Sequence, residues 1–160
     1  LALGRVAREV TRPLQARFAP RQVTVHIDDN LQVRGDPTLL RSVLENLLSN
    51  AWKYTASQSK AEIWVGRDTD PDGAPGAFFV RDNGVGFDAS RVRGGFQPFR
   101  RFHAASEFPG HGVGLASARQ ILARHGGSIW VESSPGHGAC FYFSIPEGDA
   151  PPRRPEIDRT

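Results

Sequence analysis

The sequence predicts an α+β fold: a two-layer α/β sandwich whose mixed, mostly antiparallel sheet is covered on one face by about three helices. Two observations lead to this fold class. Stretches with apolar residues every three or four positions are mixed with short strand-like stretches, and the two kinds follow no regular βαβ order. The chain has 160 residues, of which 39% are hydrophobic, and this is enough for one packed domain.

Three segments are expected to be helices. Apolar residues recur at helical spacing over residues 3–19, where Pro13 should kink or split the helix. Asp36 is suited to an N-cap and is followed by a proline, so a helix is expected from there to about residue 54. A third helix, over residues 112–125, should end at the glycine pair that follows it.

Strands are expected where branched and aromatic residues alternate with polar ones between turn residues. Residues 68–76 should form a polar loop, and residues 84–112 a glycine-rich irregular segment. Residues 147–160 are expected to be a proline-rich tail or linker. The expected strands cover residues 22–27, 31–35, 61–67, 77–82, 128–133 and 139–145.

Composition excludes several classes of protein. The 20 basic residues exceed the 17 acidic ones only slightly and form no stripe, so a nucleic-acid partner is not expected. A single cysteine excludes an internal disulfide framework and a cysteine-rich zinc site, and it fits a reducing compartment. No apolar run approaches the ~20 residues that cross a bilayer. Because the chain contains no methionine, we expect it to be a piece of a longer protein.

The helix expected over residues 36–54 has two faces. Asn46, Asn50 and Lys53 lie in a narrow polar strip beside the apolar one. This strip is either a solvated face or the edge of a pocket. In the second case, its amide oxygens suit a hard cation such as magnesium, and its ammonium suits a phosphate. The apolar face that should enter the core consists of Leu40, Leu44, Leu47, Leu48 and Ala51.

A second candidate site follows the strand expected over residues 77–82. The run 82–86 reads Asp-Asn-Gly-Val-Gly, and Asn-Gly is a strong hairpin signal, so a plain turn is one interpretation. The other interpretation uses Asp82 as a carboxylate acceptor for the exocyclic amine of adenine. The glycines would then let the backbone approach the ring closely.

A third candidate site is the glycine-rich run of residues 110–115, which precedes or opens the last helix. Free N–H groups at a helix start bind phosphate. The run is not a dinucleotide fingerprint, because no strand precedes it and no acidic residue follows at the required distance. Phe96, Phe99 and Phe102 lie upstream and predict a lid anchored by aromatic side chains. Arg101 either reaches a terminal phosphate from this lid or is solvated.

In their order and spacing these motifs resemble the ATP-binding catalytic domain of a sensor histidine kinase, of the GHKL superfamily. The resemblance covers about residues 20–146. Glu107 and Phe108 are typical of the phytochrome-like, PAS-linked branch of these kinases. The segments that carry the resemblance are residues 46–54, 82–86, 96–101, 110–115, 124–132 and 136–138.

The resemblance implies roles for individual residues. Asn50 would coordinate magnesium, and Asn46 would line the phosphate side. Lys53 would hold phosphate oxygens, Tyr54 would border the nucleotide, and Arg101 would contact the terminal phosphate. In related ATPases a glutamate at the Asn46 position activates water. An asparagine cannot act as a base, so slow hydrolysis and transfer to a protein nucleophile are implied.

The other implied roles concern the glycine-rich runs. Asp82 would accept the adenine amine, supported by the glycines that follow it, and the run that opens the last helix would form the phosphate-side turn and hinge. The catalytic candidates are Asn46, Lys53 and Arg101, and the metal ligand is Asn50. The full nucleotide-binding set is Asn46, Asn50, Lys53, Tyr54, Asp82, Gly84, Gly86, Arg101, His111, Gly112, Gly114 and Leu115.

The resemblance also implies partners and a domain plan. Residues 1–19 would lead from a dimerisation and phosphoacceptor domain that is not in this chain, residues 20–146 would be the catalytic domain, and residues 147–160 a tail. The cofactors would be ATP and Mg²⁺, the downstream partner a response regulator, and the parent protein a cytoplasmic homodimer. No nucleic-acid partner and no direct membrane contact of this domain are expected.

Some features depart from the family pattern and leave two alternatives open. His111 stands where threonine is usual, and Gly94-Gly95 precedes the lid where an apolar residue is usual. No histidine of the chain lies in a phosphoacceptor context. A nucleotide-binding pseudokinase is therefore one alternative. A serine-directed kinase of the anti-sigma type is the other, although the long lid argues against it.

Overall fold

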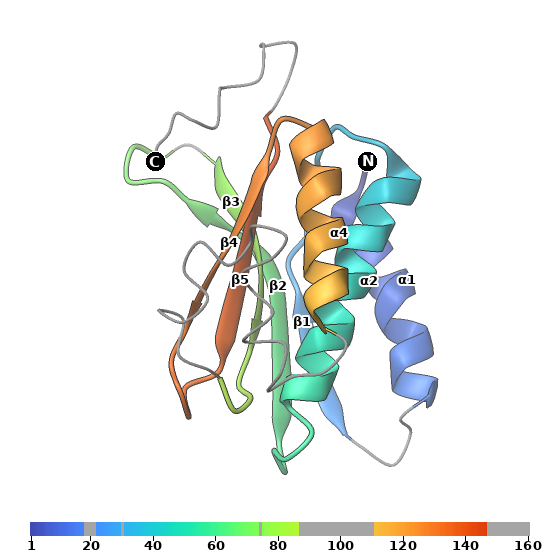
Figure 1. The fold of residues 1–160 in the computed structure, drawn as a ribbon, viewed down its shortest axis with the longest axis vertical. Helices are drawn as coiled ribbons and strands as arrows, with labels where there is room; N and C mark the ends of the chain where they lie inside the picture. The colour runs from blue at the N-terminus through green and yellow to red at the C-terminus, as the bar shows by residue number, and fades with distance from the viewer. Residues whose placement is uncertain (18–21, 30, 74, 87–110, 147–160) are drawn as a thin grey trace.

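The computed structural model describes residues 1–17, 22–29, 31–73, 75–86 and 111–146. In this part of the chain a five-stranded sheet is covered on one side by three helices (Figure 1). The predicted fold class, a two-layer α+β sandwich, is confirmed. The elements are α1 (Leu3–Arg17), β1 (Val23–Ile27), α2 (Pro37–Tyr54), β2 (Ala61–Thr69), β3 (Pro75–Asp82), α4 (His111–Arg124), β4 (Ser128–Ser133) and β5 (Ala139–Ser144).

The sheet has the strand order β1-β2-β3-β5-β4. β1 and β2 run parallel, with α2 connecting them along the chain, and all other neighbouring strands run antiparallel. This register places Asp82, the last residue of β3, between Ile63 of β2 and Ala139 of β5. The Asp82 carboxylate therefore lies at the end of the middle strand, on the face of the sheet that the helices cover.

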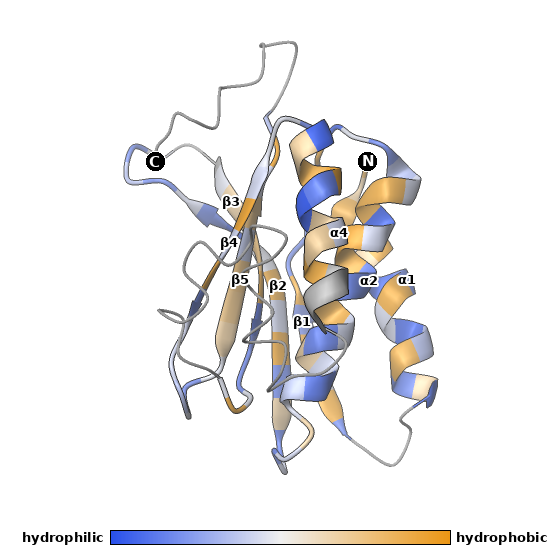
Figure 2. Cartoon of the chain, in the orientation of Figure 1, coloured by the Kyte–Doolittle hydropathy of each residue, from blue (hydrophilic) through white to orange (hydrophobic). Residues whose placement is uncertain are grey.

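The core lies between the sheet and the helices. Residues of alternating strand positions, such as Phe78, Val80 and Phe143, are buried against the helices, as the two-residue period of a strand requires. Figure 2 shows apolar residues on the helices where they face the sheet. The predicted apolar face of α2 is confirmed, because Leu40, Leu44, Leu47, Leu48 and Ala51 are all buried. The buried residues of α1 join the same cluster, so residues 3–10 complete this core.

Local capping signals give the predicted helix ends. Asp36 is the N-cap of α2, and its side chain accepts a hydrogen bond from the Leu39 N–H at 3.0 Å. After α4, Gly126 takes a positive φ of 77°, and the Gly127 N–H bonds back to the Leu122 carbonyl at 2.7 Å. The glycine pair therefore ends this helix as expected.

The structure contradicts an expected strand and an expected break in α1. Residues 31–35 form no strand: Gln32 makes a single bridge with Ala2, although Leu31 and Val33 are buried. The backbone of Leu31 and Val33 bonds to residues 1–3, at and just before the start of α1. This segment is too short to form a strand with them. Pro13 does not split α1, which continues as one helix to Arg17.

No helix in the described residues is long and apolar enough to span a membrane.

Candidate functional site

The polar strip of α2 has a buried end and an exposed end. Asn50 is 5% exposed, Asn46 is half-buried, and Lys53, in the last turn, is exposed. The Asn50 Nδ2 has no hydrogen-bond partner in the part of the chain that the structure describes. A buried amide without a partner costs free energy, so this side chain has a free donor for a group that the described residues do not supply.

Asp82 is a buried carboxylate held in one orientation. It is 3% exposed, and its Oδ1 accepts a hydrogen bond from the Gly84 N–H at 2.8 Å. Burial raises the pKa of Asp82 to about 6, and backbone hydrogen bonds from Gly84 and Ala139 counteract part of that effect. The group therefore accepts a donor best above pH 6, where it carries its charge.

Tyr54, the last residue of α2, lies beside this carboxylate. Burial raises the pKa of Tyr54, and the Asp82 charge raises it further, so the hydroxyl stays neutral. The Tyr54 ring is stacked on Phe141 with the ring centroids 6.4 Å apart. Its carbonyl oxygen accepts a hydrogen bond from the Val85 N–H at 3.1 Å. The structure thus brings together two predicted binding residues that are far apart in the sequence.

The glycines after Asp82 are required by close packing. A Cβ on Gly84 would overlap the Tyr54 carbonyl oxygen, and a Cβ on Gly86 would overlap that of Ser134. Gly86 also has a positive φ of 68°, which L side chains rarely adopt. A plain hairpin turn would not need both restrictions. The loop 82–86 is therefore wedged between the end of α2 and the turn that follows β4.

That turn is a part of the site to which sequence reasoning assigned no role. The Gly136 N–H donates to the Val85 carbonyl at 2.6 Å. Gly138 has a positive φ of 76°, and a Cβ there would overlap the carbonyl oxygen of Asp82. The sequence signal was the glycine pattern of residues 136–138, but only the pairing of β3 with β5 places it against Asp82.

The remaining predicted site residues lie at the start of α4 or in the residues just before it. His111, Gly112 and Gly114 belong to the first turn of α4, and Leu115 in the next turn is buried. α4 packs against α2, so its start and the polar strip belong to one helical layer. The predictions for Arg101 and for the lid aromatics fall on residues 87–110, outside the described residues.

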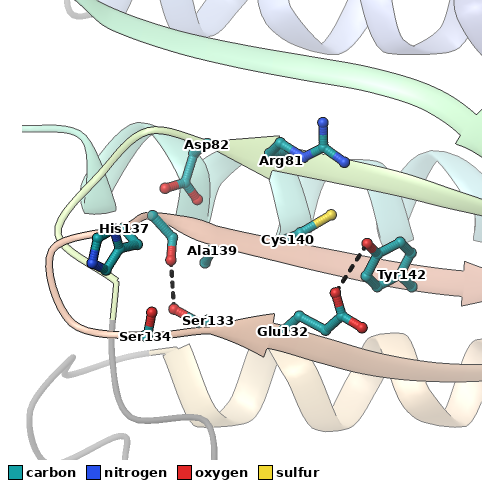
Figure 3. A pocket seen from close by; sticks show the side chains of 10 residues that line it. Arg81, Asp82, Glu132, Ser133, Ser134, His137, Ala139, Cys140 and Tyr142 are labelled. Atoms are coloured by element: carbon teal, nitrogen blue, oxygen red, sulfur yellow. Dashed lines mark hydrogen bonds between the residues drawn. The ribbon is translucent and has the colours of Figure 1, made fainter.

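A separate hollow of about 330 Å³ lies at the end of β3, β4 and β5 (Figure 3). Arg81, Cys140 and Tyr142 line it, and they alternate along their strands with residues buried under the helices. The hollow therefore belongs mainly to the sheet face that turns away from α2, and Asp82 also lines it. Burial raises the pKa of the Cys140 thiol, which fits a packed cysteine.

In the described ranges, no three histidine, cysteine or acidic side chains gather as they would around a metal ion. Amide and phosphate oxygens are the alternative ligands for a hard cation.

Comparison with known proteins identifies the family. Residues 35–149 match the histidine kinase-, DNA gyrase B- and HSP90-like ATPases, and the chain belongs to this family. It is 36% identical over 137 residues to the phytochrome-like protein Cph1 of Synechocystis, covering 85% of this chain and 18% of that protein. It is also 36% identical over 146 residues to the methanogenesis regulatory histidine kinase FilI of Methanothrix harundinacea, covering 91% of this chain and 16% of FilI.

Solved structures share the fold. The mycobacterial sensor histidine kinase MprB matches with a TM-score of 0.71 at 23% identity, over 91% of this chain and 96% of that one. Full-length ShkA, solved in complex with AMPPNP, matches with a TM-score of 0.71 at 25% identity, over 96% of this chain and 32% of that one.

The inferred resemblance is thus confirmed: the chain is a histidine-kinase-type ATPase domain, and such a domain binds ATP. It spans less than a fifth of the length of the two curated relatives, which are longer proteins.

Proposed function

We propose that this chain is the catalytic domain of a two-component sensor histidine kinase, which binds Mg-ATP and transfers the γ-phosphate to a histidine on a separate helical domain. The observation that carries the proposal is the buried Asp82 carboxylate, held beside the end of α2 by the Gly84 N–H. Burial and a fixed orientation make this group a specific acceptor rather than a solvated surface charge.

Asp82 would recognise the adenine. An ionised carboxylate only accepts hydrogen bonds, so it selects a base that presents an amine. One of its oxygens is already occupied by the Gly84 N–H, which limits the orientations in which the amine can approach. Gly84 and Gly86 keep the backbone free of side chains at this place, and Tyr54 would border the nucleotide.

The α2 strip would hold the phosphates. Rotation of the Asn50 amide exchanges its oxygen and nitrogen, so this buried and incompletely bonded group can present an oxygen to Mg²⁺. When bound, that ion neutralises phosphate charge. Asn46 lies one helical turn earlier, and the exposed Lys53 ammonium can follow the phosphates as a point charge. We assign Arg101, His111, Gly112, Gly114 and Leu115 to the other side of the phosphates by family resemblance.

Phosphotransfer needs an acceptor that reaches this site. Asn46 cannot act as a base, so water would be activated poorly and the bound nucleotide kept for a protein nucleophile. A neutral imidazole is available as a nucleophile at pH 7 and needs little base assistance. Catalysis would then consist of positioning and charge neutralisation. We place the acceptor on a dimerisation domain of a cytoplasmic, homodimeric parent protein that signals to a response regulator.

The test combines the chain with the phosphoacceptor helices of its parent protein and γ-labelled ATP. We expect label on a histidine of the added helices and none on this chain alone. Asp82→Asn in the same mixture, at an ATP concentration below saturation, serves as the control and should strongly reduce labelling. Nucleotide binding without any transfer would instead identify a pseudokinase, and label on a serine would identify the anti-sigma type of kinase.

A further inference from the structure

β3 ends at Asp82 in an unusual way. The Asn83 N–H still donates to the Glu62 carbonyl at 3.2 Å, as if β3 continued beside β2. In a regular antiparallel pair the Glu62 N–H would return this bond to the main-chain carbonyl of Asn83. It bonds instead to the side-chain Oδ1 of Asn83 at 2.8 Å.

The nitrogen of the Asn83 side-chain amide likewise takes the place of a backbone group. Asn83 Nδ2 donates to the Lys60 carbonyl at 2.9 Å. In a continued ladder, that carbonyl would receive the N–H of Val85, the residue two further along β3. One side chain thus supplies both the acceptor and the donor that two further strand residues would have supplied, and the start of β2 keeps its hydrogen bonds.

The main chain after Asn83 is thereby released from the sheet. The Gly84 N–H turns back to Asp82 Oδ1 at 2.8 Å, and the Val85 N–H crosses to the Tyr54 carbonyl at 3.1 Å. These are the contacts that hold the carboxylate and join the loop to α2. They require the backbone to leave β2 directly after the Asn83 N–H.

We propose that Asn83 is a positioning residue for nucleotide recognition: its amide completes the edge of β2 and so frees residues 84–86 to hold Asp82 against α2. This inference rests on the proposed function in taking Asp82 as the nucleotide's acceptor. The chemistry is specific to asparagine. Aspartate lacks the donor, serine offers a single polar atom, and glutamine is one methylene longer.

The test measures Asp82 itself in the nucleotide-free 160-residue chain. Carboxyl-carbon NMR follows the titration of Asp82 in the wild type and in Asn83→Ala. The wild-type pKa of Asp82 is raised to about 6 chiefly by burial. If Asn83 holds the loop, its removal admits water to the carboxylate, and the titration midpoint falls toward the ordinary value of 3.8.

Gln15→Ala is the matched control, because Gln15 also donates a side-chain amide to a strand carbonyl, that of Val23 at 3.0 Å, but lies in α1. It should leave the Asp82 midpoint unchanged. Calorimetry of Mg-ATP binding to the folded proteins should show affinity about tenfold lower in Asn83→Ala and unchanged in Gln15→Ala.

Asn83→Ser repeats the titration if Asn83→Ala does not fold. An unchanged Asp82 midpoint in the folded variant overturns the inference, and so does loss of folding in both variants, because the amide would then be needed for the sheet as a whole. A lowered midpoint in a chain whose wild type binds no ATP supports the role of Asn83 and refutes the proposed function instead.

Discussion

Replacing Asp82 by asparagine should have opposite effects on stability and on nucleotide binding. The pKa of Asp82 is about 6 in the folded chain and 3.8 in its ordinary state, so the folded chain binds this proton more tightly than the unfolded chain does. The resulting stabilisation is complete below pH 3.8 and is lost as the pH rises through about 6. At pH 7 the buried charge costs about 3 kcal/mol of folding free energy.

Asparagine removes that charge but not the whole hydrogen-bonding pattern. Its single carbonyl oxygen can keep the bond from the Gly84 N–H, while one of the two backbone bonds to the carboxylate is lost at about 1 kcal/mol. We therefore expect Asp82→Asn to raise the free energy of unfolding at pH 7 by about 2 kcal/mol, which corresponds to a melting temperature higher by about 4–8 °C.

Nucleotide binding should change in the other direction. The asparagine amide offers a neutral acceptor and adds a donor that faces the adenine amine. Loss of a hydrogen bond to a charged group costs about 1.5–3 kcal/mol, so the affinity for ATP at pH 7 should fall by about 10- to 100-fold. In the wild type the same loss should develop as the pH falls through about 6, where Asp82 becomes protonated.

The assays are urea unfolding at pH 7 and pH 4.5, and calorimetry with an ATP analogue over the same range. The stability difference between variant and wild type should be positive at pH 7 and shrink toward pH 4.5. A variant that is less stable than the wild type at pH 7 would refute the view that burial dominates at this carboxylate. Unchanged affinity for the analogue would refute the assignment of Asp82 to the adenine.

Two further substitutions test the neighbouring parts of the site, and a third is a control outside it. Asn50→Ala loses no hydrogen bond of the Nδ2 to the described residues, so the free energy of unfolding of the nucleotide-free chain should stay within about 1 kcal/mol of the wild type. Calorimetry should show Mg-dependent ATP affinity about tenfold lower, and equal losses with and without Mg²⁺ would contradict a role as ligand. Gly84→Ala drives a Cβ into the Tyr54 carbonyl, so calorimetry should show ATP affinity at least about tenfold lower. Gly73→Ala, at a positive φ in open space, should cost about 1 kcal/mol and leave ATP affinity unchanged.

Local patterns in the sequence predicted the elements whose causes are themselves local. The cap at Asp36, the apolar face of α2 and the glycine pair after α4 depend on residues within one or two helical turns. The predicted strand over residues 31–35 failed for the opposite reason. Whether an extended segment becomes a strand depends on a partner backbone, and here the partner is the short segment before α1.

The order of motifs along the chain was enough to identify the family, and it predicted a set of residues for the site. It could not show how these residues meet. Asp82 acquires its burial, and hence its raised pKa, only because β3 pairs with β5 and the end of α2 covers the loop after it. The role of Asn83 was hidden as well, since an Asn-Gly pair in the sequence indicates no more than a turn.

The sequence by itself determined which side chains are present and where helices can begin and end, because spacing and capping act over a few residues. The tertiary structure decided which amide of α2 has no partner among the described residues, which carboxylate is buried, and which glycines have no room for a Cβ. The physical reason is that solvation and close contact are properties of atoms brought together from distant parts of the chain.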